Sequence, residues 1–365
     1  MKIALLTPTF FQYSGIDRVV KQQAAEFAQG GDTVTIFTFE ADLESPQNVE
    51  LQLLGTPRNS FWQRVYRLSF PLDIVKTVKW LPKLKNFDIV YSHQYPMNWL
   101  AYLAKRFYRI RYIYYNHGIA SPVTFSNVIE GIYMRILSRL TNWTARRADG
   151  AISVSQHLQQ QLEQETGLIS EIVYNKIDTT RFYEGLDSSR IRDKYGLGSS
   201  PLILYVGRIS PHKGVHLLIE AFNLVRQEIS EARLLIVGKH TFLGYSKKLR
   251  YMANDSISFT GYITDEEIPY YFAACSVYAT ATLWEGFNLP LVEAQACGKP
   301  VVAFNIGPHP EVVKESETGF LVPPGDTIAL AKAIIRLLRD SRLRHQMGKN
   351  AVKMVKEKFS RGSIE

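Results

Sequence analysis

Residues 202–237 read LILYVGRISPHKGVHLLIEAFNLVRQEISEARLLIV and contain two apolar runs with a helical pattern between them. The run at 202–206 predicts a buried strand, and the apolar positions from 215 to 225 recur at helical spacing. The apolar run at 234–237 predicts a second strand. A strand, a helix and another strand in this order indicate a parallel sheet with crossover helices.

The same alternation runs along the rest of the chain and predicts its domain organisation. A chain of 365 residues exceeds what one hydrophobic core usually covers, so two domains are expected. We predict an α/β protein with two Rossmann-like doubly wound domains facing across a cleft: residues 1–178, then 179–345, with 346–365 as a closing helix. The other predicted strands are 3–7, 33–38, 89–92, 112–116, 150–154, 256–260, 277–279 and 300–303.

Composition narrows the class of protein. Cys275 and Cys297 lie in apolar company and are expected to be buried small side chains, without a disulfide or zinc site. Pro8 breaks the apolar run at the start, which favours a first strand over a signal peptide. No apolar run reaches the about eighteen residues of a membrane span. We therefore expect a soluble or peripheral cytoplasmic protein.

A basic segment stands out at residues 58–111, with eleven Lys or Arg against Asp73 and Asp88. Aromatic residues are interleaved with these bases, a mixture suited to an anionic membrane surface. The alternative interpretation is an amphipathic helix pair with a solvated basic face. Nucleic acid is not an expected partner, because no nucleic-acid-reading module is present.

The loop at 207–214 follows a predicted strand and carries Arg208 and Lys213. Ligands of open α/β sheets bind beyond the carboxyl ends of strands. An Arg fork and a mobile Lys charge together suit a leaving diphosphate. A solvated basic turn is the alternative. The turn at Gly15 also follows a strand and lets a phosphate or sugar approach the backbone, but it lacks the GxGxxG spacing of a dinucleotide dehydrogenase.

The segment 285–300 reads EGFNLPLVEAQACGKP and predicts a short helix over 289–297. Pro290 suits its first turn, Asn288 its N-cap and Gly298 the residue past its end. Glu285 then lies on the loop before the helix and Glu293 about one turn inside it. Two carboxylates here suit the hydroxyls of a ribose and a hexose, although surface capping is the simpler interpretation of a lone glutamate pair.

Segments 207–214 and 285–300 together resemble the family 4 glycosyltransferases of the GT-B fold. The resemblance covers nearly the whole chain and includes Gly15, the strand-end histidine His117, the interdomain stretch 175–178 and the segment 319–326. It implies that Arg208 and Lys213 bind the diphosphate of a sugar donor, Glu293 the ribose and Glu285 the transferred sugar. His117 and Glu285 are the implied catalytic residues. The other implied donor-binding residues are Gly15, Tyr262, Ile263, Gly286, Phe287, Asn288 and Leu289.

The resemblance further implies that the closing helix, 346–365, returns to the first domain. It also implies a retaining hexosyltransferase that needs no cofactor and no metal ion. The expected donor is a UDP-sugar, with a GDP-sugar as the alternative, and the expected acceptor is a glycan or lipid-linked molecule of cell-surface polysaccharide or glycoconjugate synthesis. The rival hypotheses are a nucleotide-sugar 2-epimerase and a non-catalytic sugar-nucleotide-binding partner. The sequence departs from the family pattern at Lys176, at Pro308, at Thr280-Ala281-Thr282 and at its end, which lacks the usual tryptophan.

Overall fold

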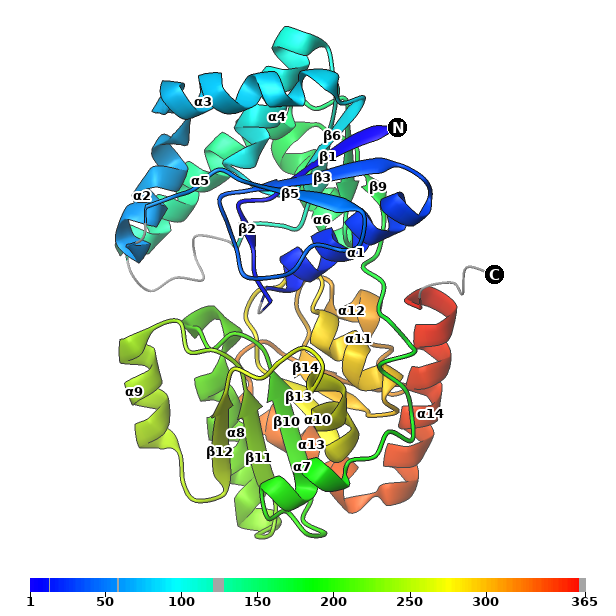
Figure 1. Ribbon diagram of the computed structural model, residues 1–365. Coiled ribbons are helices and arrows are strands. Elements are labelled where there is room, and N and C mark those ends of the chain that lie inside the picture. Colours follow the sequence, from blue (N-terminus) through cyan, green and yellow to red (C-terminus); the bar gives the residue numbers. More distant parts are fainter. Residues whose placement is uncertain (13, 58, 121–127, 361–365) are drawn as a thin grey trace. The chain divides into compact units, whose positions relative to one another are not determined.

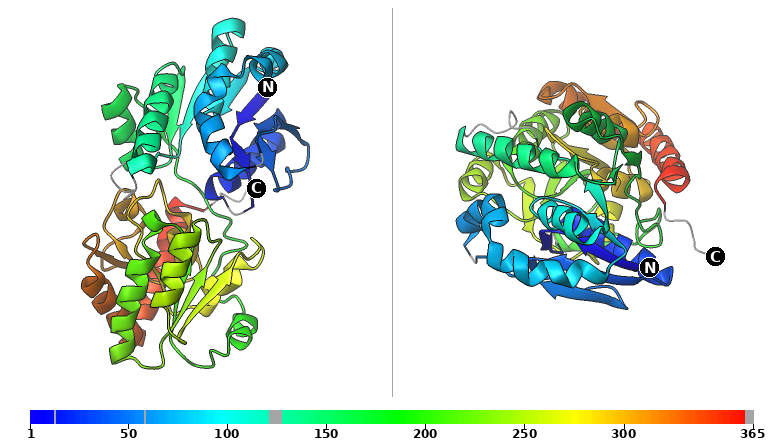
Figure 2. Two further views of the ribbon diagram at one scale, coloured as in Figure 1. Left: turned by 90° about the vertical axis from the view of Figure 1, so that its left-hand side faces the viewer. Right: turned by 90° about the horizontal axis from the view of Figure 1, so that it is seen from above.

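The computed structural model describes residues 1–12, 14–57, 59–120 and 128–360, and these residues form two compact units. The first unit spans Met1–Val173 and the second Tyr174–Glu365. The division thus falls a few residues before the boundary expected at 178. Each unit is an α/β layer structure with helices on both faces of a parallel sheet (Figures 1 and 2).

The first unit is built on a parallel sheet in the order β5-β3-β1-β6-β7-β8-β9. A short parallel pair, β2 and β4, lies beside it. The strands are β1 (Lys2–Leu6), β2 (Thr9–Phe10), β3 (Thr33–Thr38), β4 (Glu40–Ala41), β5 (Val49–Leu53), β6 (Ile89–Ser92), β7 (Arg111–Asn116), β8 (Gly150–Ser153) and β9 (Glu171–Ile172).

Alternating side chains of this sheet pack into two cores. Ala4 and Leu6 share a core with Met97 and Leu100 of α4, whereas Ile3 and its neighbours on the other face pack against α1. This is the period-two alternation expected of a strand covered on both faces. The helical segments are α1 (Gly15–Gln29), α2 (Ser60–Ser69), η1 (Phe70–Leu72), α3 (Ile74–Trp80), η2 (Leu81–Asn86), α4 (Met97–Tyr108), α5 (Val128–Ala145) and α6 (Gln156–Thr166), where η marks a 3₁₀ helix.

The second unit is built on a parallel sheet in the order β12-β11-β10-β13-β14-β15. Ile203 and Tyr205 of β10 enter a core with α8 and α13, and α10 and α11 contact strands of the same sheet. The strands are β10 (Leu202–Val206), β11 (Arg233–Val237), β12 (Ile257–Gly261), β13 (Val277–Thr280), β14 (Val301–Phe304) and β15 (Gly319–Val322).

The helices of the second unit begin just after the carboxyl ends of its strands or return to their amino ends. They are α7 (Ser189–Lys194), η4 (Pro211–Lys213), α8 (Val215–Glu228), α9 (Leu243–Met252), α10 (Ile268–Ala274), α11 (Leu289–Ala296), α12 (His309–Val312), α13 (Thr327–Arg339) and α14 (Ser341–Lys358). Helix α14 packs on α11 and α13. The expected return of residues 346–365 to the first domain stays a prediction.

The predicted doubly wound α/β class is confirmed, and every predicted strand corresponds to an observed one to within a residue at each end. The prediction missed β5 and β9, which are a half-polar strand and a two-residue strand at the two edges of the first sheet. It missed the two-residue strands β2 and β4 as well. It also missed β15, which starts at Gly319. A Cβ there would lie 2.2 Å from the carbonyl oxygen of Val301, so glycine lets β15 approach β14 closely.

Cys275 and Cys297 are buried free thiols, as expected, and burial raises the pKa of Cys275 to about 12. In the described part of the chain, no helix combines the length and the apolar character needed to cross a membrane.

Candidate functional site

The second sheet changes winding direction between β10 and β13. From β10 the chain proceeds to β11 and β12 on one side, and then returns to β13 on the other. The loops that leave β10 and β13 therefore diverge at this switch point, where doubly wound sheets bind their ligands. These are the loops that carry Arg208 with Lys213 and Glu285, respectively.

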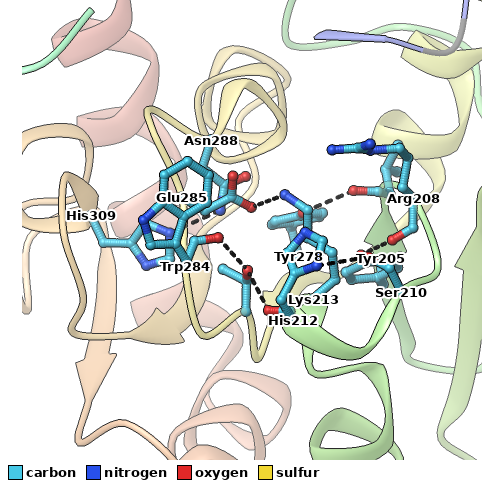
Figure 3. A network of polar contacts seen from close by, with 12 residues as sticks. Tyr205, Arg208, Ser210, His212, Lys213, Tyr278, Trp284, Glu285, Asn288 and His309 are labelled. Atoms are coloured by element: carbon cyan, nitrogen blue, oxygen red, sulfur yellow. Dashed lines mark hydrogen bonds and ion pairs between the residues drawn. The ribbon is translucent and has the colours of Figure 1, made fainter. Parts of the chain in front are cut away.

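Backbone contacts fasten the two loops to one another. The amide of Leu283 donates to the carbonyl oxygen of His212 at 2.9 Å. The Thr282 hydroxyl lies 3.3 Å from that oxygen and 3.1 Å from the carbonyl oxygen of Trp284 (Figure 3). Gly214 has φ +61°, and a Cβ at this position would lie 1.8 Å from the carbonyl oxygen of Ala281. Only glycine allows this approach, so the loops hold a fixed spacing.

Lys213 and Glu285 meet across the junction of these loops. The Lys213 Nζ donates to Glu285 Oε1 at 2.6 Å, and the side chains are 15% and 12% exposed. Burial lowers the pKa of Lys213, while the charge of Glu285 opposes that shift. Arg208 is exposed on the same loop, and its carbonyl oxygen accepts from the Tyr205 hydroxyl at 3.0 Å. The structure thus brings Lys213 and Glu285 together, with Arg208 a few residues away along the loop (Figure 3).

The start of α11 is shaped by Asn288 and His309. Asn288 has φ 74°, a left-handed conformation that asparagine tolerates better than most residues. Its Nδ2 donates to His309 Nε2 at 2.9 Å, because His309 Nδ1 lies 2.6 Å from the carbonyl oxygen of Phe304 and must carry its proton toward that acceptor. Burial lowers the pKa of His309, which keeps this imidazole neutral.

Asn288 therefore occupies the N-cap position of α11 as predicted, but its side chain makes no capping hydrogen bond. That part of the prediction is wrong, because His309 holds the Asn288 amide instead. Pro290 in the first turn, Gly298 after the end and the helix itself are confirmed. His309 was not singled out from the sequence, since its partner lies on a distant loop.

The remaining predicted residues of this unit surround α11 or lie on an outer loop. Glu293 is buried within α11, and Gly286 and Phe287 are buried on the loop before it, which continues into Leu289. Tyr262 and Ile263 follow β12, the edge strand, which β11 separates from β10. Tyr262 is exposed, whereas Ile263 is buried.

Phe287 anchors the loop before α11 to both ends of the second unit. Its ring lies 6.1 Å from the ring of Tyr174 and 5.7 Å from that of Phe359, and those two rings are also 5.7 Å apart. The amide of Ile177 donates to the carbonyl oxygen of Phe359 at 2.9 Å. The chain following the first unit, the end of α14 and the loop that carries Glu285 thus share one aromatic cluster.

In the first unit, Gly15 is the first residue of α1 and follows the N-cap Ser14. Two residues later, Asp17 is buried and was missed by sequence reasoning. Its carboxyl group accepts from the amide of Phe11 at 2.9 Å and from the hydroxyls of Thr9 and Thr7 at 3.0 and 3.4 Å. Burial raises the pKa of Asp17 to about 7, against the opposing effect of these hydrogen bonds.

His117 lies at the end of β7 and contacts His93, the residue after β6. His93 Nδ1 and His117 Nε2 are 2.9 Å apart, so one ring donates and the other accepts. The two rings and that of Tyr115 stack with centroids 4.8 to 5.2 Å apart. Burial lowers the pKa of His117 to about 3 and that of His93 well below its usual value. Both imidazoles are therefore neutral near pH 7.

Two family models match consecutive parts of the sequence. The model described as Glycosyltransferase Family 4 matches residues 13–181, and that described as Glycosyl transferases group 1 matches residues 187–354. The chain belongs to glycosyltransferase family 4. The recognition made from the loops around Lys213 and Glu285 is thereby confirmed.

The relatives of this family 4 chain have names that describe different enzyme activities. It is 35% identical over 185 residues to the GDP-mannose-dependent alpha-(1-6)-phosphatidylinositol monomannoside mannosyltransferase of Mycolicibacterium smegmatis, over 47% of this chain and 48% of the relative. It is 29% identical to the N-acetyl-alpha-D-glucosaminyl L-malate synthase of Bacillus anthracis, over 80% of this chain and 75% of the relative. The chain spans about half the length of several curated relatives that it matches at about one third identity.

The fold has a counterpart among solved structures. The crystal structure of Anabaena Alr3699/HepE in complex with UDP and glucose superimposes with a TM-score of 0.81 at 24% identity, over 99% of this chain and 96% of that one. This likeness confirms the GT-B type of fold predicted for the family 4 chain.

Proposed function

We propose that this chain is a retaining hexosyltransferase that transfers a sugar from a nucleoside diphosphate to a hydroxyl of a glycan or lipid-linked acceptor. The observation that carries the proposal is the fixed junction of Lys213 and Glu285 at the switch point of the second sheet, in a family 4 chain. A cation and a carboxylate held side by side suit a substrate that has a diphosphate next to a hydroxyl-rich sugar.

The proposed roles follow the chemistry of each side chain. Arg208 and Lys213 stabilise the negative charge that grows on the diphosphate as the glycosidic bond breaks. The first amides of α11, which the Asn288 side chain does not cap, add donors for the same anion. Glu285 accepts hydrogen bonds from hydroxyls of the transferred sugar, and Glu293 from those of the ribose.

We propose that the leaving group needs no divalent metal ion, because Arg208 and Lys213 supply positive charge at the diphosphate. The acceptor hydroxyl attacks from the face that the diphosphate leaves, which retains the anomeric configuration. Two relatives suggest which sugar donors to test. The Mycolicibacterium enzyme is named as GDP-mannose-dependent, and the Anabaena structure contains UDP and glucose. We propose a UDP-sugar, with GDP-mannose as the competing candidate.

We further propose that His117 positions the sugar through a hydrogen bond made by its neutral ring. Replacing His117 with Ala is expected to lower turnover more than about tenfold while donor affinity changes little, because the uncharged ring contributes little to binding the diphosphate. Steady-state kinetics alongside nucleotide titrations separate the two effects. Unchanged turnover would remove the proposed role.

The experiment that tests the proposed function is product analysis with UDP-glucose, UDP-N-acetylglucosamine and GDP-mannose, each with and without glycan and lipid-linked acceptors. Release of the nucleoside diphosphate together with a new α-linked product, only when acceptor is present, is the expected result. Conversion of the donor to its 2-epimer without acceptor would instead identify an isomerase. Nucleotide binding without turnover of any donor would identify a non-catalytic binding protein.

A further inference from the structure

The first unit exposes apolar side chains along a belt of helices formed by α2, η1, α3 and α5. Leu72 is 80% exposed and Val75 81%, values unusual for large apolar residues in a folded unit. Figure 1 shows α2, α3 and α5 on the left-hand side of the first unit. The exposed members of this helical belt are Trp62, Val65, Leu72, Ile74, Val75, Val78, Val128, Ile129, Ile132, Ile136 and Trp143.

Helix α5 presents its apolar residues as an outward stripe. Ile129, Ile132 and Ile136 follow one another at spacings of three and four residues, which places them on one face of the helix. Thr141 and Thr144 are buried on the inner side. The stripe is therefore an exposed helix face, and burial in the core of the first unit does not account for it.

Helix α2 is oriented in the same manner and is linked to α5. Its Tyr66 packs edge-on against Phe39 of the core, whereas Trp62 is exposed. Arg64 of α2 lies 3.5 Å from Glu130 of α5, so the two helices are neighbours. The exposed residues of α2 and α5 thus belong to one region of the surface.

The belt is rimmed by positive charge. From residue 60 to 86 the sequence has six Lys or Arg and a single acid, Asp73. Asp73 accepts from the Tyr66 hydroxyl at 2.7 Å and from the amide of Lys76, so its carboxylate is engaged locally. The basic side chains that are exposed on or beside the belt include Lys79, Lys83, Lys85, Arg135 and Arg139.

We infer that this helical belt docks on an anionic lipid bilayer, with its apolar side chains inserted at the interface and its bases against the headgroups. Apolar area and positive charge on one surface are the two contributions that peripheral membrane helices combine. A second copy of the chain is a poorer occupant, because a symmetric dimer through this surface would place its bases against one another. The inference does not depend on the proposed sugar transfer, since docking requires no donor.

Vesicle flotation of the full chain tests the inference directly. Binding to phosphatidylcholine vesicles that contain about one third phosphatidylglycerol should be at least about tenfold tighter than to phosphatidylcholine alone, and should weaken as salt is raised. The double variant Lys79→Gln/Lys85→Gln should reduce binding by on the order of tenfold to thirtyfold, because each base near an anionic surface contributes about 1 kcal/mol. The double variant Leu72→Ser/Val75→Ser should reduce binding to the same vesicles through the lost apolar insertion.

Matched control variants distinguish a specific effect of the belt from a general effect of removing exposed basic or apolar side chains. Lys349→Gln/Lys356→Gln on α14 removes two exposed bases of the second unit, and Leu243→Ser/Tyr251→Ser on α9 removes two exposed apolar residues. These variants should float like the wild type. An equal loss of vesicle binding in the control variants and the belt variants would overturn the inference. Binding that does not increase with anionic lipid would overturn it as well. A dimer in solution that the belt variants disperse, without vesicle binding, would assign the surface to a second copy instead.

Discussion

At the scale of single residues, Lys213 is neutralised by Glu285 before any sugar donor arrives. The ammonium and the carboxylate are 2.6 Å apart and mostly shielded from solvent, so each strongly affects what the other can bind. A diphosphate that approaches Lys213 meets a partly balanced charge. The roles of Lys213 and Glu285 can therefore be distinguished by substituting Glu285 alone.

Replacing Glu285 with Gln removes the negative charge and keeps the shape. We expect nucleoside diphosphate affinity to stay equal or rise a few-fold, because Lys213 is released from its partner, while turnover falls by more than about tenfold. Calorimetry and steady-state kinetics on the same preparation measure both quantities. Glu357→Gln, an exposed acid on α14, is the control. A parallel loss of affinity and turnover would show that Glu285 acts mainly by positioning Lys213.

Asp17 predicts a pH dependence of stability in the first unit. Its pKa is about 7 in the folded chain, against an ordinary value of 3.8 for an aspartate side chain, so the folded state binds more protons between those values. The contribution of Asp17 to the free energy of unfolding is therefore largest below the lower value and falls as pH rises toward about 7.

Urea unfolding of the wild type and of Asp17→Asn, from about pH 5 to about pH 8, measures this contribution as the difference between the two proteins. The advantage of the wild type should shrink with rising pH by on the order of 2 kcal/mol. An advantage that grows with pH would mean that the buried carboxyl group is preferentially ionised. All other ionisable groups are common to both proteins, so their effects largely cancel in the difference.

Single residues were predicted from the sequence only where a local motif marked them. Lys213 and Glu285 stand in such motifs, and the structure brings them together. His93 and His309 escaped notice because their partners lie on other loops, more than twenty residues away along the chain. Asp17 escaped notice although its partners lie only six to ten residues earlier, because the fold of the turn and not its sequence spacing brings them together. A histidine directly after a predicted strand, as His93 is, was the one available signal.

At the scale of elements, the two loops of the site depend on Gly214. Replacing it with Ala puts a methyl group on the carbonyl oxygen of Ala281 and strains a left-handed backbone. We expect the free energy of unfolding to fall by more than about 2 kcal/mol, with weaker nucleotide binding. Thermal or urea unfolding measures the loss.

Gly244→Ala on α9 is the matched control for this substitution. No atom lies within 4 Å of a Cβ at Gly244, and its backbone is helical, so alanine should be neutral or slightly stabilising there. If the two variants lose the same stability, the close approach of the loops is not what Gly214 provides.

Element boundaries followed the sequence wherever apolar patterning was strong. Strand β10 and helix α11 are where the pattern placed them, because a buried parallel strand and a helix that has proline in its first turn and glycine after its end have clear local signatures. Strand β5 has alternating polar residues and half-exposed positions, and β15 opens with a glycine, so neither has such a signature. Thr282, a departure from the family pattern, links the two loops with its hydroxyl group, which only the structure reveals.

At the scale of the whole molecule, each unit repeats one plan: a parallel sheet that switches direction, with its candidate site residues beyond the carboxyl ends of the strands. The order of strands in each sheet depends on long-range pairing, so the sequence predicted the class but not the location of the switch. In the second unit that switch lies between β10 and β13 and explains why two segments separated by about seventy residues form one site.

We propose that the loop of Arg208 and Lys213 binds the diphosphate of a sugar donor without a metal ion. The most direct measurement is calorimetric titration in EDTA with UDP, GDP, ADP and their sugar conjugates, on the wild type, Arg208→Ala and the control Arg342→Ala. We predict one preferred nucleotide whose affinity is unaffected by EDTA, weakened about tenfold or more by Arg208→Ala and unchanged by the control. Binding of none of these nucleotides, or equal affinity in wild type and Arg208→Ala, would show that this loop does not bind the diphosphate of the donor.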